Sequence, residues 1–376
     1  MRTERHPLTA ASPGTQRELH SLHFGQAGAG RKAVIQASLH ADEPPGMLVA
    51  HHLRGLLADL EVSNRIDGEI VLVPMANPIG LGQRVLGRTL GRFALADGEN
   101  FNRHYADLSR RAAELLGGEG FPTSTIDVSS ARRALQRACQ ELPATSELLS
   151  LRRILLGLAI DADLVLDLHC DNEAVMHLYT ATSLWSRVEP LARLLGARAS
   201  LLADESGDDP YDEACSTVWR RLNGHLRERS PDATLLPDAC VAVTVELRGE
   251  ADVSHDLAAS DARALVDYLV LEGFINMPVP ELPPLLAGAT PLAGPLPVVA
   301  LVSGVLVFVR APGDLLRRGE HVADVIDPLS GSVTALASPA DGLMYARESG
   351  RTVQAGMSVA KVAGSEAVRA GRLLSA

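Results

Sequence analysis

Residues 35–47 read IQASLHADEPPGM, an apolar run that ends in a histidine, two acidic residues and two prolines. The apolar part belongs to a predicted buried strand over residues 32–39. In open α/β sheets, ligands bind beyond the carboxyl ends of the strands, so polar residues at such an end indicate a site. The two prolines fix their own backbone φ angles and would stiffen the loop that carries His40 and Glu43.

Two further strands end in chemically similar residues. Residues 162–171 read ADLVLDLHCD, with His169 near the end, and residues 241–247 read VAVTVEL, with Glu246. A lone H-x-x-E spacing, as in His40 and Glu43, is common by chance, but a second strand-end histidine favours a metal site. Two imidazoles and one carboxylate leave the fourth zinc position open, as a catalytic site requires.

The rest of the first 275 residues alternates between strand and helix patterns. Strands are predicted over 18–24, 69–75 and 199–203, and helical spacing appears over 46–60, 127–160, 183–197, 212–228 and 259–272. Asp127 and Thr145 are the predicted N-caps of the second helical stretch. Residues 80–110 show no period and are predicted to form one long functional loop. This alternation predicts an α/β fold with a mixed, mostly parallel sheet covered on both faces.

The composition changes after Phe274. Residues 276–297 are rich in proline and are predicted to be a semi-rigid linker. Residues 298–376 show short alternating strands separated by glycine turns, which predicts a small all-β domain. The predicted organisation is therefore a catalytic domain at 1–275, a linker at 276–297 and a β-domain at 298–376.

Composition and charge exclude several classes of protein. The net charge is −11 and the basic residues are scattered, which argues against nucleic-acid binding. No apolar stretch approaches the ~18 residues that span a bilayer, and the first residues lack the apolar centre of a signal peptide. The four cysteines are widely spaced and read as reduced thiols. We therefore expect a soluble cytoplasmic protein.

Residues 91–105, GRFALADGENFNRHY, resemble the D-x-N-x-N-R segment of the zinc carboxypeptidase superfamily. With this segment, the chain is similar to the succinylglutamate desuccinylase/aspartoacylase family. The shared order is H-x-x-E, then arginine followed by Asn-Arg, then a strand ending D-L-H, then a strand ending in glutamate. The resemblance implies a three-layer α/β/α zinc-carboxypeptidase-like sandwich over residues 15–275.

Residue roles follow from this resemblance together with the chemistry. His40, Glu43 and His169 would hold one zinc ion per chain, and Glu246 would be the general base. Arg92 is preferred over Arg84 and Arg88 as the oxyanion-stabilising arginine. Asn102 and Arg103 would bind a substrate carboxylate, and Asp167 would orient His169. Two alternatives remain open: Glu246 paired structurally with Arg248, and Asp171, Glu173 and His177 forming either a substrate-amine contact or, as we prefer, a solvated strand edge.

The C-terminal segment resembles a biotinyl or lipoyl barrel sandwich. The turn that would carry a modifiable lysine, near SPADG, has none, so the resemblance implies a lid or assembly element rather than a carrier. The oligomeric state stays open, with a homo-oligomer formed through this domain as one option.

The predicted activity is zinc-dependent hydrolysis of the linear amide of a small-molecule N-acyl amino acid. A metallocarboxypeptidase that acts on short peptides or peptidoglycan stems is the enzymatic alternative. A zinc-binding relative without turnover is the alternative from another class.

Overall fold

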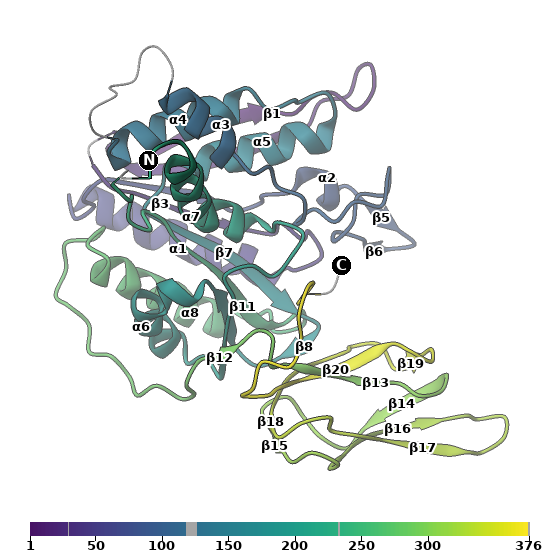
Figure 1. Ribbon diagram of the computed structural model, residues 1–376. Coiled ribbons are helices and arrows are strands. Elements are labelled where there is room, and N and C mark those ends of the chain that lie inside the picture. Colours follow the sequence, from purple (N-terminus) through teal and green to yellow (C-terminus); the bar gives the residue numbers. More distant parts are fainter. Residues whose placement is uncertain (29, 118–125, 232–233, 375–376) are drawn as a thin grey trace.

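A computed structural model describes residues 1–28, 30–117, 126–231 and 234–374 of the chain. Within these residues, nine strands form one sheet in the order β1-β2-β4-β3-β7-β11-β9-β10-β12 (Figure 1). Their bounds are β1 (Arg2–Pro7), β2 (Glu18–Gly25), β3 (Lys32–Ala37), β4 (Glu69–Val73), β7 (Leu164–Asp171), β9 (His177–Thr180), β10 (Ala199–Leu202), β11 (Val241–Gly249) and β12 (Thr290–Pro291).

The centre of the sheet is parallel. Strands β4, β3, β7 and β11 run in the same direction. On one side of them, β2 is antiparallel to both β4 and β1, and on the other side β9 is antiparallel to β11. The carboxyl ends of β3, β7 and β11 therefore meet at one edge of the sheet. The predicted mixed, mostly parallel sheet is confirmed.

Helices cover both faces of the sheet (Figure 1). One face carries α3 (Ser109–Leu116), α4 (Val128–Gln140), α5 (Glu147–Ala159) and α7 (Tyr211–Arg229), and the other carries α1 (Pro45–Val62), α6 (Trp185–Leu195) and α8 (His255–Leu271). Side chains alternate along the strands, so Val34 belongs to the first core and Ile35 to the second. The two cores make the three-layer α/β/α arrangement.

The helix starts follow local hydrogen bonding. Asp127 caps α4, as predicted, in a reciprocal box with Ser130. The prediction of Thr145 for α5 is wrong, because the side chain of Ser146 accepts the hydrogen bond from Leu149 N.

Residues 80–110 are not one loop. They contain the end of α2 (Pro78–Leu81), a hairpin of β5 (Arg84–Val85) and β6 (Arg88–Thr89), and the start of α3. Leu86 and Gly87 form the tip with φ of 50° and 83°. Strands of two residues are too short to give a detectable period.

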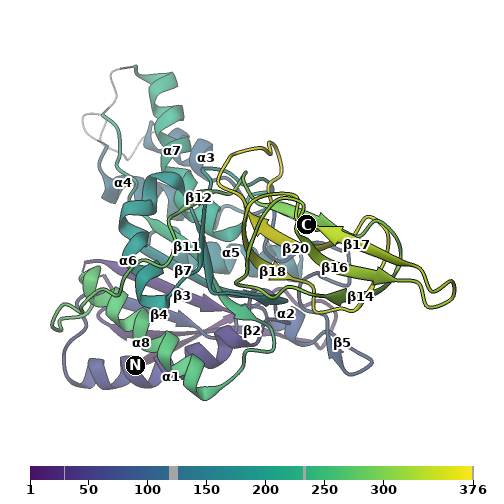
Figure 2. The same ribbon diagram turned by 90° about the horizontal axis from the view of Figure 1, so that it is seen from below.

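The C-terminal part is all-β, as predicted. Two sheets, β13-β20-β18-β15 and β17-β16-β14-β19, enclose a separate apolar core (Figure 2). Their bounds are β13 (Leu296–Val299), β14 (Gly304–Phe308), β15 (Leu315–Leu316), β16 (His321–Ile326), β17 (Val333–Ala337), β18 (Gly342–Arg347), β19 (Thr352–Val353) and β20 (Ser358–Ala363). The proline-rich segment supplies β12 and the start of β13, and the division into domains stays a prediction.

The C-terminal all-β region, called the β part below, packs against residues 171–177, for which the sequence favoured exposure to solvent. β8 (Glu173–Ala174) pairs with β18, and His177 is fully buried on β9. The preferred reading of residues 171–177 as a solvated strand edge is therefore wrong for its inner part. The covering strand lies far along the chain, so no local pattern announces it. None of the described helices has the length and apolar character needed to cross a bilayer.

Candidate metal centre and substrate cavity

His40, Glu43 and His169 converge at the carboxyl ends of two parallel strands. His40 follows β3, Glu43 precedes α1, and His169 lies on β7, which pairs directly with β3. One ligand atom from each residue lies within 4.8 Å of the others, and all three side chains are buried. Gly46 lets α1 start close to β7, because a Cβ there would lie 3.1 Å from the Leu168 carbonyl oxygen.

The two imidazoles present the same nitrogen to Glu43. His40 Nδ1 lies 2.8 Å from Glu43 Oε1, and His169 Nδ1 lies 2.8 Å from Glu43 Oε2. The opposite nitrogens contact oxygen acceptors: His40 Nε2 is 3.0 Å from Asn100 Oδ1, and His169 Nε2 is 2.9 Å from Asp167 Oδ2.

These contacts place one proton on each imidazole ring. Asn100 Oδ1 and the Asp167 carboxylate accept hydrogen bonds, so each Nε2 carries a proton and each Nδ1 is directed at Glu43. An imidazole nitrogen that lies 2.8 Å from a carboxylate oxygen shares either a proton or a metal ion with it. The donor set, two imidazole nitrogens and a carboxylate, fits zinc.

Electrostatics favour a cation at the same point. Burial would raise the pKa of Glu43, but His40 and His169 hold it well below its usual value. Against the effect of burial, Asp167 and Glu43 raise the pKa of His169 well above its usual value. The centre therefore keeps an ionised carboxylate and attracts positive charge.

Glu246 lies beside this centre. It is the register partner of His169 on the neighbouring parallel strand β11, so the two side chains share a face of the sheet. Its Oε2 is buried and has no hydrogen-bond partner among the described residues. Burial and the charge of Glu43 raise the pKa of Glu246 to about 8. The alternative pairing with Arg248 is not observed, because Arg248 pairs with Asp261.

Of the three candidate arginines, the fold brings Arg92 to the centre. Its Nη2 donates to Glu43 Oε1 at 3.0 Å. Gly91 makes this approach possible, because a Cβ there would lie 2.2 Å from Asp42 N. Arg84 contacts the Gly87 carbonyl within the hairpin, and Arg88 is exposed there.

Asn102 and Arg103 are buried next to His169. Asn102 Nδ2 lies 3.4 Å from His169 Nε2, and its Oδ1 accepts a hydrogen bond from Tyr211 N at 2.9 Å. Arg103 Nη1 donates to the Asn102 carbonyl oxygen at 2.7 Å. The amide oxygen of Asn102 thus fixes the start of α7.

The sequence analysis did not identify two residues that support His40. Asn100 accepts from His40, and buried Arg152 donates to the Asn100 carbonyl oxygen at 2.8 Å. Asn100 lies inside the quoted stretch ENFNR and could have been considered, whereas Arg152 sits in an ordinary helical pattern with no signal.

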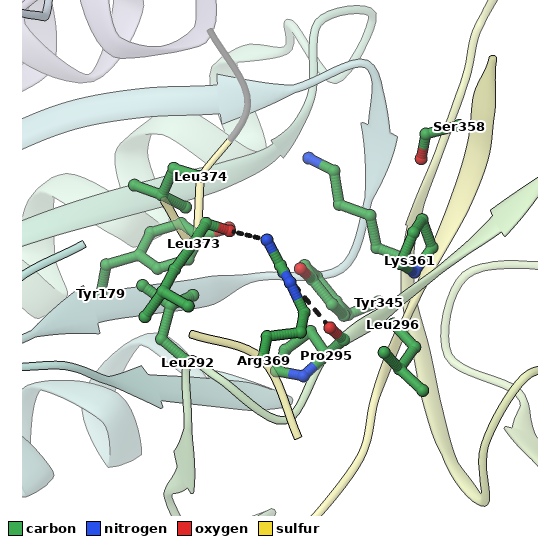
Figure 3. A pocket seen from close by; sticks show the side chains of 11 residues that line it. Tyr179, Leu292, Pro295, Leu296, Tyr345, Ser358, Lys361, Arg369, Leu373 and Leu374 are labelled. Carbon is green, nitrogen blue, oxygen red and sulfur yellow. Dashed lines mark hydrogen bonds between the residues drawn. The ribbon is translucent and has the colours of Figure 1, made fainter. Parts of the chain in front are cut away.

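Two neighbouring cavities lie on the side of the centre marked by Asn102. The inner one, 40 Å³, is lined by Asn102, Arg103, Tyr179, Asp212, Glu213 and Leu374, among others. The outer one, 230 Å³, lies between the two parts of the fold and is drawn in Figure 3. Tyr179, Leu292 and Leu374 belong to both walls. The metal ligands line neither cavity themselves, and Asn102 links the inner one to His169.

The β part contributes directly to the outer cavity. Lys361, on β20, reaches across to Asp171 at the end of β7, with Nζ 2.6 Å from Oδ2. Tyr345, on β18, forms another part of the wall (Figure 3).

The tail segment, residues 364–374, closes one side of both cavities. Leu373 N donates to the Ser206 carbonyl oxygen at 2.8 Å, and Arg372 pairs with Asp208 at 2.8 Å. Arg369 donates to the carbonyl oxygens of Pro295 and Leu373, as the dashed lines of Figure 3 show. Leu374 is then held on the shared wall.

Comparisons with known proteins agree with this architecture. The model of the succinylglutamate desuccinylase/aspartoacylase catalytic domain matches residues 29–271. A succinylglutamate desuccinylase/aspartoacylase family protein from Shewanella amazonensis SB2B is 25% identical, with a TM-score of 0.81 over 96% of this chain and 98% of that chain. No curated protein is significantly similar in sequence.

More distant structures share the fold. A succinylglutamate desuccinylase/aspartoacylase from Shewanella frigidimarina NCIMB 400 is 24% identical, with a TM-score of 0.81 over 96% of this chain and 97% of that chain. The product-bound ectoine utilization protein EutE (DoeB) from Ruegeria pomeroyi is 17% identical, with a TM-score of 0.64 over 96% and 94%.

Proposed function

The chain belongs to the succinylglutamate desuccinylase/aspartoacylase family, and from this we propose that it is a zinc-dependent hydrolase that cleaves the linear amide bond of N-acyl amino acids. The observation that carries the proposal is the buried set of His40, Glu43 and His169 with Glu246 in register beside it. The substrate is a small molecule, and the four free, buried cysteines suit a reducing cytoplasm.

His40, Glu43 and His169 would hold one zinc ion per chain. Zinc so held acidifies a water molecule and polarises the scissile carbonyl group. The protonated Nε2 atoms, fixed by Asn100 and Asp167, keep both Nδ1 lone pairs directed at the ion's place.

Glu246 moves the proton. Its carboxylate takes a proton from the attacking water and passes it to the leaving nitrogen. The charge of Glu43 is one cause of the raised pKa of Glu246, so neutralising that charge lets Glu246 act as a base near neutral pH.

Arg92 and the Asn102–Arg103 pair act on the substrate. Arg92 contacts Glu43, and 37% of its side chain is exposed, so its guanidinium can also face the oxygen that gains negative charge. Arg103 offers the planar fork that matches the free carboxylate of an amino acid. Asn102 would position that carboxylate beside His169.

The cavity dimensions favour a small substrate over a peptide. The space lined by Asn102 and Arg103 measures 40 Å³, and the outer one that shares its wall measures 230 Å³. A metallocarboxypeptidase would need room for several residues, whereas an acyl amino acid requires only one.

The test combines metal content with turnover. Zinc is measured in the purified wild type, in His169→Ala and in the control His255→Ala, which changes an exposed histidine of another surface. Each protein is then assayed on N-acetyl and N-succinyl amino acids and on dipeptides. We expect about one zinc per chain and acyl-amino-acid hydrolysis in wild type and control, with both lost in His169→Ala.

Other results would redirect the proposal. Cleavage of dipeptides but not of acyl amino acids would indicate a carboxypeptidase. Stoichiometric zinc without any turnover would indicate a binding protein.

A further inference from the structure

The outer cavity, drawn in Figure 3, has a mainly apolar wall. Leucine and proline side chains form much of it, and the rings of Tyr179 and Tyr345 add aromatic surface. The leucines are Leu292, Leu296, Leu373 and Leu374. Leu292 and Tyr345 are each 3% exposed, so this wall belongs to the interior of the molecule. An apolar space that the protein's own side chains leave open is suited to an apolar ligand.

The two basic residues of this wall bind groups of the protein itself. Lys361 Nζ lies 2.6 Å from Asp171 Oδ2. Arg369 donates to the carbonyl oxygens of Pro295 and Leu373. No acid is among the described residues that line the cavity. An anionic ligand would have to compete with Asp171 for Lys361, whereas an apolar ligand would leave these bonds in place.

The cavity begins beside the proposed general base. In the antiparallel pair of β9 and β11, His177 lies opposite Glu246, which is also the register partner of His169. Tyr179, two residues further along β9, lies on the same face of the sheet as these side chains. The ring centroid of His177 is 5.4 Å from that of Tyr179 and 5.1 Å from that of Tyr345. A substrate bound at Glu246 therefore has this aromatic cluster as its neighbour.

The histidine of this cluster carries no charge at neutral pH. Burial lowers the pKa of His177 to about 4. Its Nδ1 donates to the Val175 carbonyl oxygen at 2.8 Å, and its Nε2 lies 3.4 Å from the Tyr179 hydroxyl group. Both ring nitrogens are thus used within the protein, and the cluster offers aromatic surface rather than a free ion.

The volume of the outer cavity suits one ring or one branched chain. It measures 230 Å³, and an apolar cavity of about 150 Å³ is enough to hold a benzene molecule. The rings of Tyr179 and Tyr345 favour an aromatic group that meets them edge to face or offset. Size and chemistry therefore agree on the same kind of ligand.

We propose that the outer cavity binds an apolar group of the substrate, about the size of a phenylalanine or leucine side chain. The enzyme then prefers hydrophobic N-acyl amino acids over those that carry a second charged group. This inference rests on the proposed function. The apolar group belongs either to the amino acid or to the acyl chain, and the substrates of the test distinguish the two.

The test is a set of kcat/KM values for the wild type. One series keeps the acetyl group and varies the amino acid through phenylalanine, leucine, alanine, aspartate and lysine. The other keeps alanine and varies the acyl group through acetyl, hexanoyl, phenylacetyl and succinyl. In one series we expect the apolar members to exceed acetylalanine and the charged members about tenfold or more, because burial of one such group contributes that much. That series identifies the group that the cavity binds.

A variant with a filled cavity locates the preference. Leu296→Trp adds a ring to the wall from β13 and is expected to lower kcat/KM of the preferred substrate about tenfold. Its kcat/KM for acetylalanine is expected to stay within twofold of the wild type. Val299→Trp changes an exposed residue of the same strand that does not line the cavity, and is expected to keep the wild-type ratio.

The outcomes separate this inference from the proposed function. Hydrolysis in which no apolar member is preferred in either series overturns the inference and leaves the proposed function standing. A preference that Leu296→Trp leaves unaltered also overturns it, because another part of the molecule would then hold the apolar group. If no acyl amino acid is hydrolysed, the proposed function fails, and calorimetric binding of acetylphenylalanine against acetylaspartate, in wild type and Leu296→Trp, tests the cavity by itself. The wild-type values decide even where a variant fails to fold.

Discussion

Asp167 and His169 lie on the same face of β7, and Asp167 Oδ2 contacts His169 Nε2 at 2.9 Å. The other oxygen of Asp167 accepts a hydrogen bond from Gln36 on the adjacent strand at 2.9 Å. The carboxylate is thus held from β3 and in turn holds the imidazole. An i, i+2 spacing on a strand is enough to bring two side chains together in this way.

Asp167→Asn should weaken zinc binding. The amide cannot stabilise the Nε2–H of His169 as a carboxylate does, and loss of such a partner lowers metal affinity about 10–100-fold. Competition with a chelator measures the change. Asp163→Asn, just before the same strand, should leave the affinity unaltered, and an unchanged affinity in Asp167→Asn would show that Asp167 does not orient the ligand.

Glu246→Gln should separate metal binding from chemistry. The amide keeps the size of the side chain but takes no proton, so kcat should fall by about 10²–10⁴ while zinc content stays at the wild-type level. Metal analysis and steady-state kinetics on the same preparation give both numbers. A fall of less than threefold would assign the base to another group.

Arg92→Ala should lower kcat by about 10²–10³, because a positive donor beside Glu43 would be lost from the developing oxyanion. Arg88→Ala, in the exposed hairpin, is the matched control and should stay within twofold of the wild type. Parallel assays of both variants at saturating substrate make the comparison. Equal losses in the two would place the oxyanion arginine elsewhere.

Glu213 should make stability depend on pH. The unfolded chain releases this proton near pH 4.5, but the folded protein retains it to about pH 8. Between these values unfolding releases a proton, so rising pH favours the unfolded state, with a slope of at most about 1.4 kcal/mol per pH unit from this group. Urea unfolding of the ligand-free protein at several pH values should show a shallower decline in Glu213→Gln than in wild type. Identical slopes would mean that Glu213 ionises normally.

The cluster of His40, Glu43 and His169 could be predicted from the sequence because its signals are local. His40 and His169 each end a strongly apolar strand, and parallel neighbours bring such ends together. The start of α5 illustrates the limit of such signals, since Thr145 and Ser146 are both good N-caps and only the chain path selects Ser146.

The cavity could not be predicted, because its walls come from distant segments. Asp212 and Glu213 look like ordinary acids at a helix start, and Lys361 looks like a surface lysine in a late strand. Lys361 instead pairs with Asp171 across the two parts, and Leu374 of the tail segment shares a cavity wall with both acids. Pattern analysis within a window of residues does not detect such contacts.

The tail segment has a practical consequence for how the protein should be prepared. Leu374 lines both cavities, so the segment that leads to a C-terminal tag is itself part of the cavity wall. A purification tag on that end would compete for the cavity or pull the segment away, and either effect would distort measured substrate preferences. A removable tag on the other end would extend from β1, the edge strand of the large sheet, and would leave the cavity as it is.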